Sequence, residues 1–372
     1  MFLSQLHLQN FRNYQDQRLE FTASKTILLG DNAQGKSNLL EAIYLLATLK
    51  SHRVSRDRDL IRTNYDLGQI SAQIKSRHGV LELTCKLRQG GKRSFAINGV
   101  HQQRQLDFLG NVQAVLFSCL DLELIRHTPD SRRQWLDHIL VQLEPIYASL
   151  MQEYHKVLRQ RNALLKTALK QPAELAVWNT QLVQTGSKIM RRRWRLIERL
   201  LPLAQKWHDQ ISGGSEHLAI SYAPKLECDR WDNPEAVQQA LWQTIEQKQS
   251  LELIQGTSLV GPHRDDVKFL IGDSPAREYG SQGQQRTLIL ALKLAELELM
   301  ESVVGVTPIL LLDDVLAELD LHRQNQLLAV IGDRIQTIVT TTHLHSFEPA
   351  WLASAQILQV ANGVIYASDR NA

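Results

Sequence analysis

Cysteine is scarce in this sequence. Cys85, Cys119 and Cys228 are the only three among 372 residues, and they are far apart along the chain. Their odd number excludes a complete set of disulfides, and their spacing is not that of a zinc site. Free thiols are typical of proteins that stay in a reducing compartment. The sequence therefore favours a cytoplasmic protein.

Long hydrophobic runs are also missing. No stretch approaches the roughly 20 consecutive apolar residues of a membrane-spanning helix. The first residues, MFLSQLHLQNFRNY, alternate between apolar and polar side chains as a half-buried strand does, and they do not resemble a signal peptide. We expect a soluble protein that does not associate with a membrane.

A large excess of charge of either sign is absent as well. The chain has 42 Lys and Arg residues against 39 Asp and Glu residues, which gives a formal net charge of +3. This balance neither indicates nor excludes a nucleic-acid partner, so any basic surface has to be local.

What is present is a division into three regions. The first region, 1–125, and the last, 255–372, combine short apolar strands with helices, whereas 126–254 repeats apolar residues at helical spacing. Pro172 and Gly213-Gly214 interrupt the helical region, and Asn98-Gly99 predicts a hairpin turn in the first region. We predict an α/β head that is assembled from both ends of the chain and interrupted by a mostly helical lobe.

The strongest local pattern is GDNAQGKS, Gly30–Ser37, between an apolar strand and a helix. It fits the phosphate-loop motif G-x-x-x-x-G-K-[ST], in which backbone N–H groups surround a phosphate, Lys36 reaches the β- and γ-phosphates and Ser37 binds Mg²⁺. A loop that merely turns is the alternative. The expected nucleotide contacts are Gly30, Asp31, Asn32, Ala33, Gln34, Gly35, Lys36, Ser37 and Asn38.

Two acids end the apolar run ILLLDD, Ile309–Asp314. Such a run is typical of a buried parallel strand, and ligands bind at the carboxyl ends of those strands. We expect Asp313 to hold the metal and Asp314 to act as a general base towards water. Two adjacent acids are often only a turn, but the phosphate loop favours a site. His343 ends a further strand, TIVTTTH, and is expected at the same edge near the γ-phosphate.

The turn YGSQGQQR, Tyr279–Arg286, leads into a long apolar helix. Ser281 can cap that helix, or the helix start can bind an anion through its free N–H groups. A cap needs only the serine, so the glycines and glutamines favour an anion site. The expected contacts are Ser281, Gln282, Gly283 and Gln284.

These pieces in this order resemble the ABC-type ATPases, whose signature motif corresponds to SQGQQ here. Gln282 stands where transporters have glycine, and Ala317 of the segment Ala317–Asp320 stands where serine is more usual. The resemblance implies an ABC-type ATPase head with a phosphate-loop sheet and an antiparallel β subdomain. It also implies a dimer in which Ser281 of one subunit faces the nucleotide bound by Lys36 of the other.

Within that class the chain resembles the RecF family over nearly its whole length. The marks are NFRNY (10–14), GDNAQGKSNLLEAI (30–43), SRRQWLD (131–137), GPHRDD (261–266), YGSQGQQR (279–286) and LLLDDVLAELD (310–320). Cys119 and Leu120 depart from the family, which has Pro-Glu there. That departure leaves the glutamine of the nucleotide site unassigned, with Gln113 as one candidate.

The resemblance implies a DNA-binding homodimer that uses ATP and Mg²⁺ in recombinational repair, replication restart and the SOS response. It implies binding to gapped, duplex or junction DNA, a weak DNA-stimulated ATPase that acts as a switch, and loading of RecA together with RecO and RecR. Three alternatives remain open: the ATPase subunit of a transporter, a chromosome-organising ATPase of the SMC type, and a metabolic phosphate-loop kinase. The long heptad repeats of the SMC class are missing here.

Two basic stretches could contact DNA phosphates without reading sequence. We favour the basic segment Lys50–Arg62, because it follows the phosphate-loop helix; the expected contacts are Arg53, Arg56, Arg58 and Arg62. For Lys188–Arg195 a solvated helix face is an equal alternative. Neither stretch has an aromatic platform for single strands, so duplex DNA is the expected target. GPHRDD could be a metal or catalytic cluster, or a structural ion pair.

Overall fold

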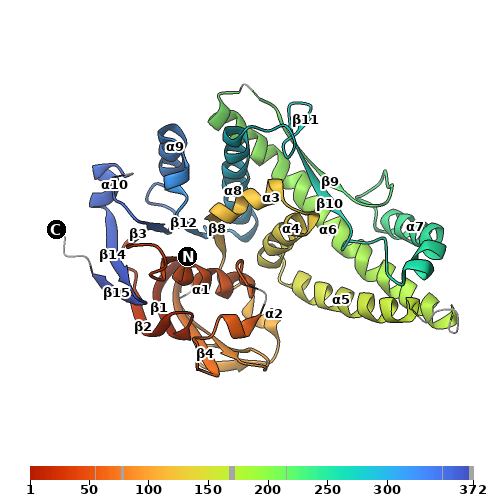
Figure 1. The fold of residues 1–372 in the computed structure, drawn as a ribbon, viewed down its shortest axis with the longest axis horizontal. Coiled ribbons are helices and arrows are strands. Elements are labelled where there is room, and N and C mark those ends of the chain that lie inside the picture. Colours follow the sequence, from red (N-terminus) through yellow and green to blue (C-terminus); the bar gives the residue numbers. More distant parts are fainter. Residues whose placement is uncertain (55, 77–78, 167–171, 215, 346, 368–372) are drawn as a thin grey trace. The chain divides into compact units, whose positions relative to one another are not determined.

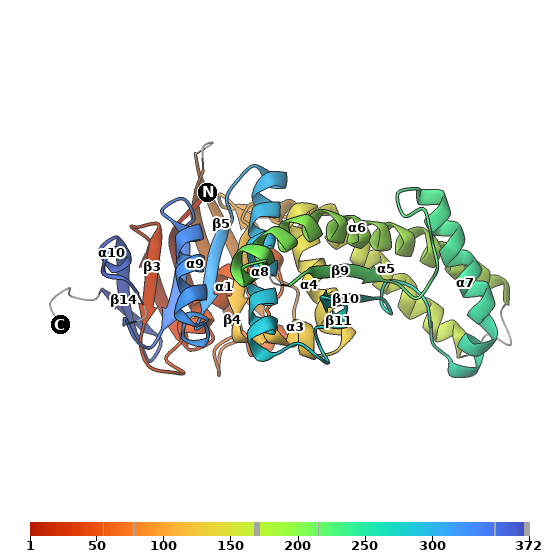
Figure 2. The same cartoon turned by 90° about the horizontal axis from the view of Figure 1, so that it is seen from above.

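A computed structural model describes residues 1–54, 56–76, 79–166, 172–214, 216–345 and 347–367. Contacts between Cα atoms divide the chain into two compact units. Unit 1 comprises Met1–Asp121 and Lys293–Ala372, and unit 2 comprises Leu122–Leu292. Helix α8 (Gln282–Val304) begins in unit 2 and ends in unit 1. Figures 1 and 2 show the fold with many of its elements labelled.

The first sheet of unit 1 is antiparallel, with strand order β2-β1-β4-β5-β6-β7. Its strands are β1 (Phe2–Phe11), β2 (Tyr14–Glu20), β4 (Leu67–Ser76), β5 (Gly79–Arg88), β6 (Ser94–Ile97) and β7 (Val100–Gln102). Leu6 and Leu8 are buried on one face of β1, while Gln5 is exposed on the other, which confirms the predicted alternation. Asn98 and Gly99 have φ of 49° and 77°, as a two-residue hairpin turn requires, so the predicted turn is confirmed.

The second sheet of unit 1 has the order β15-β14-β3-β13-β12-β8. Its strands are β3 (Lys25–Leu29), β8 (Ala114–Ser118), β12 (Ile309–Asp313), β13 (Thr337–Thr341), β14 (Ala355–Ala361) and β15 (Val364–Ala367). All neighbours are parallel except β14 and β15. In Figure 1 the red β3 lies among blue strands, because both ends of the chain contribute to this sheet. The predicted assembly of one head from both ends is confirmed.

Helix α1 (Lys36–Thr48) packs on this second sheet and contacts β8, β12 and β13. It is buried along almost its whole length, which explains why its sequence LLEAIYLLA is apolar except for Glu41. The other helices of unit 1 are α2 (Gln105–Phe108), α9 (Leu321–Ile331) and α10 (Pro349–Ala353), with short 3₁₀ turns at 57–59 and 316–318.

Unit 2 is mainly helical. Its helices are α3 (Glu123–Arg126), α4 (Pro129–Leu143), α5 (Ile146–Leu165), α6 (Pro172–Ser212) and α7 (Pro234–Gln255), and its sheet has the order β11-β10-β9, formed by β9 (Leu218–Ala223), β10 (Asp266–Ile271) and β11 (Ser274–Pro275). Helix α6 packs against α5 and α7 (Figure 2). It begins at Pro172 and ends before Gly213 and Gly214, both with positive φ, so the predicted breaks are confirmed.

The sequence placed the second domain boundary between residues 254 and 255, and the contacts of the structure do not follow that division. Strand β10 pairs with β9 along its whole length, from Asp266 opposite Ala223 to Ile271 opposite Leu218. Residues 255–292 therefore group with the helical lobe in unit 2. Backbone pairing between distant segments leaves no local signal in the sequence, so composition alone did not reveal it.

A charged network lies in the interior of unit 2. Arg161 and Glu252 are both fully buried and form an ion pair of 2.5 Å. The other Arg161 nitrogens donate to Asn179 Oδ1 at 2.7 Å and to Ser258 Oγ at 2.6 Å, and Leu259 N donates to Glu252 Oε1 at 2.7 Å. Additional hydrogen bonds of this kind allow a buried ion pair to persist.

Candidate functional site

The phosphate-loop sequence connects β3 to α1 in unit 1, as predicted. Gly35 is the N-cap of α1, with φ of 118° and no side-chain cap, so the first N–H groups of the helix are left for a ligand. A Cβ atom at Gly35 would lie 2.6 Å from Asn13 Nδ2, and one at Gly30 would lie 2.3 Å from the carbonyl oxygen of Val360. Only glycine therefore allows the chain to pass at these two positions.

Lys36 is buried beneath the loop. Its Nζ donates to the carbonyl oxygens of Gly30 at 2.6 Å and of Asp31 at 2.8 Å. Burial lowers the pKa of Lys36, and the nearby carboxylates of Asp314 and Asp313 act in the opposite direction. A cation that two carbonyl oxygens hold at the loop fits the binding of an anionic phosphate.

Ser37 and Asp313 meet at the carboxyl edge of the sheet. Ser37 Oγ donates to Asp313 Oδ1 at 2.8 Å, and Thr340 Oγ1 of β13 donates to the same oxygen at 2.8 Å. Over the part of the chain that the structure describes, no group of three or more His, Cys, Asp and Glu side chains could hold a metal. Mg²⁺ that also binds phosphates needs only one or two protein oxygens, so the hydroxyl and carboxylate fit this ion.

Asp314 follows with an unusual backbone. Its φ is 56°, in the left-handed region that aspartate and asparagine tolerate better than most residues, and its N–H donates to Thr340 Oγ1 at 2.9 Å. Burial raises the pKa of Asp314, while the charges of Lys36 and His343 act to lower it. A carboxylate with a raised pKa is suited to accept a proton from water.

His343 comes from the end of β13, as predicted. Strands β3, β13 and β12 are parallel neighbours, so their carboxyl ends lie at one edge of the sheet. The exposed ring of His343 stacks on that of His345, with 5.1 Å between their centroids. The structure thus brings Lys36, Asp313 and Asp314 together with this histidine.

The signature turn belongs to unit 2. Ser281 Oγ accepts a hydrogen bond from Gln284 N at 3.2 Å, and Gln284 Oε1 accepts one from Ser281 N at 2.7 Å. This reciprocal pair is a capping box, so the predicted cap is confirmed. The predicted anion site stays a prediction; Ser281 and Gln282 are exposed, and Gly283 is half-buried.

Gln113, the candidate glutamine, lies at the opposite end of β8. It precedes the first residue of that strand, and its Nε2 donates to Gly110 O at 2.8 Å. The carboxyl end of β8 instead leads to Asp121, which accepts from Ser118 N at 2.6 Å and pairs with buried Lys293 at 2.7 Å. Sequence reasoning missed this pair because nothing local links residues so far apart in the chain.

Glu41 was also missed. It is fully buried in α1, where Arg12 donates to both of its carboxylate oxygens at 2.8 and 2.7 Å and Ser51 Oγ donates to Oε1. Burial acts to raise the pKa of Glu41, but the hydrogen bonds from Arg12 and Ser51 hold it below its ordinary value. A lone carboxylate inside the apolar run LLEAIYLL was the signal that could have revealed it.

The basic segment Lys50–Arg62 lies beside α1. Arg53, Arg56 and Arg58 are exposed, and Arg62 is half-buried. Arg53 donates to Asn38 Oδ1 at 2.8 Å. The second stretch, Lys188–Arg195, has a structural component. Arg193 is 2% exposed and donates to both oxygens of Asp137.

GPHRDD lies within a buried polar network of unit 2. Tyr154 and His263 Nδ1 form a hydrogen bond of 2.6 Å, and Tyr222 donates to Asp265. Asp266 pairs with Arg132 at 2.6 Å. These contacts favour the structural interpretation of the motif.

Asp265 gives unit 2 a specific pH dependence, because burial raises its pKa from 3.8 to about 6. The folded state then holds a proton between about pH 4 and 6 that the unfolded state has lost. The stabilising contribution of protonated Asp265 is complete below about pH 4 and disappears as the pH rises through 6. As the pH is lowered from 6 to 4, we expect the free energy of unfolding of the wild type to rise relative to that of Asp265→Asn, by on the order of 1 kcal/mol per pH unit. Urea denaturation at pH 5, 6 and 7 measures this, and a constant difference would contradict it.

The arrangement in unit 1 defines the head of an ABC-type ATPase, with a phosphate-loop sheet next to an antiparallel sheet. The family model described as RecF/RecN/SMC N terminal domain matches residues 2–365. An SMC head domain from Pyrococcus furiosus superposes with a TM-score of 0.54 at 16% identity, covering 99% of this chain and 96% of that one, which shows a shared fold alone. Among the described residues, none of the helices is long and apolar enough to span a membrane.

The chain belongs to the RecF family of DNA replication and repair proteins. It is 56% identical to the DNA replication and repair protein RecF of Rippkaea orientalis, with 98% of this chain and 100% of that protein covered, and 57% identical to that of Nostoc punctiforme, with 98% and 99% covered. A solved structure of the recombination mediator protein RecF with ATP, described as part of the RecFOR pathway, superposes with a TM-score of 0.91 at 30% identity, covering 99% of this chain and 98% of that one. The family that the sequence motifs predicted is confirmed.

Proposed function

We propose that this protein binds DNA under the control of ATP during replication and recombinational repair, and that ATP joins two copies of the chain. The observation that carries the proposal is the convergence of Lys36, Ser37, Asp313 and Asp314 at one edge of the parallel sheet. The ATP-bound structure of a RecF protein supports it.

Each residue of the site has a separate role in this proposal. The N–H groups at the start of α1 and the ammonium of Lys36 hold the phosphates, and Ser37 with Asp313 holds Mg²⁺. Bound Mg²⁺–ATP supplies an activated phosphoryl group. Asp314 orients water and accepts its proton, and His343 contacts the terminal phosphate. Hydrolysis is slow, because an aspartate reaches the water less well than a glutamate.

A second subunit completes the site. Ser281 and Gln282 are exposed at the start of α8, where a capped turn presents a hydroxyl and amide groups to a neighbour. In the proposed dimer this turn contacts the phosphates that Lys36 of the other subunit holds, and the segment Ala317–Asp320 lines the seam. ATP then stabilises the dimer because it bridges the two subunits.

Arg53, Arg56, Arg58 and Arg62 contact the phosphates of duplex, gapped or junction DNA. This contact is independent of base sequence and weakens steeply with salt. The dimer on DNA cooperates with RecO and RecR to load RecA in the cytoplasm, and DNA stimulates its weak ATPase. Hydrolysis releases the dimer and resets the switch.

Mixing two inactive variants tests the shared site. Lys36→Arg and Ser281→Arg are each expected to abolish ATP turnover as homodimers. A mixed dimer contains one site with both substitutions and one with neither, so turnover should reappear on mixing, at about a quarter of the wild-type rate for random pairing. Steady-state ATPase assays on DNA measure this. No recovery, with dimers present by sedimentation, would place Lys36 and Ser281 in the same site of one chain.

A further inference from the structure

The turn Asn10–Tyr14, NFRNY, connects β1 to β2 and has no role in the proposed function. Asn10 and Arg12 have φ of 47° and 54°, so two residues in the left-handed region enclose Phe11. Phe11 and Tyr14 are fully buried and anchor the turn in the core of unit 1. The turn is therefore a rigid structure with a strained backbone.

One side of this turn holds the phosphate loop. Asn13 Nδ2 donates to the carbonyl oxygen of Gln34 at 2.9 Å, and Tyr14 OH donates to that of Gly35 at 3.0 Å. Asn13 Oδ1 accepts from Asn38 Nδ2 at 2.8 Å. These bonds reach the loop immediately before Lys36.

The other side holds the end of the basic segment. Arg12 N donates to Leu60 O at 2.8 Å, and Arg62 N donates to Asn10 O at 2.9 Å. The Arg12 guanidinium donates to Asp59 O at 2.7 Å as well as to buried Glu41. The same few residues thus bond to both the loop and the segment.

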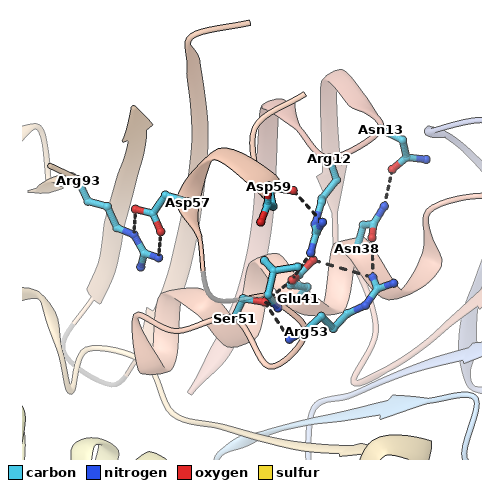
Figure 3. Close-up of polar contacts among 10 residues, drawn as sticks. Arg12, Asn13, Asn38, Glu41, Ser51, Arg53, Asp57, Asp59 and Arg93 are labelled. Atoms are coloured by element: carbon cyan, nitrogen blue, oxygen red, sulfur yellow. Dashed lines mark hydrogen bonds and ion pairs between the residues drawn. The ribbon is translucent and has the colours of Figure 1, made fainter. Parts of the chain in front are cut away.

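The beginning of the basic segment is bonded to α1, the helix that follows the phosphate loop (Figure 3). Arg53 donates to Asn38 Oδ1, and Ser51 Oγ donates to Glu41. A polar path therefore runs from the Gln34 carbonyl oxygen through the side chains of Asn13 and Asn38 to the side chain of Arg53.

We propose that the Asn10–Tyr14 turn couples the phosphate loop to the basic segment, with Asn13 and Arg12 as the positioning residues. A displacement of Gln34 or Gly35 changes the bonds of Asn13 and Tyr14. It passes through Asn38 and Glu41 to Arg53, because Asn38 is hydrogen-bonded to both Asn13 and Arg53 and the fully buried Glu41 is hydrogen-bonded to both Arg12 and Ser51. ATP at the loop thereby alters how the arginines meet DNA phosphates. This inference rests on the proposed function.

The test measures the affinity of the full-length protein for a 30-base-pair duplex with and without ATP, at one salt concentration, together with ATP affinity. ATP is expected to tighten wild-type binding by about tenfold, within the usual range of coupling between sites. Asn13→Ala should still bind ATP. In the absence of ATP it should bind DNA with the affinity of the wild type, but ATP should tighten its DNA binding much less than tenfold. Asn13→Asp, which keeps the acceptor for Asn38 but lacks the donor to Gln34, should also lose most of the gain from ATP.

Two controls separate coupling from general damage. Gln5→Ala removes a hydrogen bond from Gln5 in β1 to Glu20 in β2, outside the path, and should keep the full gain. Arg58→Ala should weaken binding equally with and without ATP. If ATP tightened DNA binding by both Asn13 variants as much as by the wild type, the coupling would be overturned. Loss of ATP binding in both variants would also overturn it, because it would place Asn13 in the nucleotide site. No ATP effect in the wild type would overturn the switch itself along with the coupling.

Discussion

Replacement of Asp314 by asparagine is expected to slow ATP turnover by about two to four orders of magnitude, the usual contribution of a general base. Asparagine tolerates the backbone φ of 56° at this position, so the fold and ATP binding should persist. The ATP-bound dimer should then accumulate on DNA. Single-turnover hydrolysis and sedimentation with ATP measure the two effects.

The pH profile adds a second readout for Asp314. Burial raises the pKa of this carboxyl group, and only the carboxylate can accept a proton. As the pH is lowered, turnover of the wild type should therefore begin to fall at a higher pH than an ordinary aspartate would give. Turnover of Asp314→Asn should not show this fall. Asp273→Asn, an exposed aspartate in a turn of unit 2, is the matched control. Turnover of Asp314→Asn close to the wild-type rate, or a monomer in ATP, would sink the mechanism.

Arg161→Met is expected to lower the free energy of unfolding of unit 2 by about 3–5 kcal/mol. The substitution leaves the Glu252 carboxylate buried without its cation, and Asn179 and Ser258 lose a donor. Urea denaturation followed by tryptophan fluorescence measures the loss. The double variant Arg161→Met/Glu252→Gln should lose less than the sum of the single variants, because the unpaired charge is then removed.

The surface pair Arg192–Glu144 provides the control for that prediction. Its side chains are 28% and 46% exposed at a separation of 2.9 Å. Arg192→Met should cost less than about 1 kcal/mol, since water already solvates both charges. Equal losses for Arg161→Met and Arg192→Met would show that burial does not govern the energetics of these arginines.

The local motifs were readable from the sequence because their chemistry lies within a few consecutive residues. Glycines in Gly30–Ser37 allow the turn before α1, an apolar run ending in Asp313 and Asp314 forms a buried parallel strand, and Ser281 with Gln284 forms a capping box. The strand-helix alternation at both ends of the chain similarly predicted the head.

Other features were beyond reach of those patterns because they depend on which distant segments meet. The pairing of β10 with β9 places 255–292 in unit 2, and the packing of α1 brings Glu41 to Arg12. The parallel pairing of β8 with β12 also places Gln113 at the end of β8 that lies away from Asp313 and the phosphate loop.

The sequence by itself determined the phosphate loop, the acidic strand end and the cap of α8, since backbone conformation and short-range hydrogen bonds follow from adjacent residue types. Only the tertiary structure decided which buried charges are paired and which hydroxyl and carboxylate share a hydrogen bond. The physical reason is that a charge leaves water only where a partner from elsewhere in the chain compensates for its lost hydration.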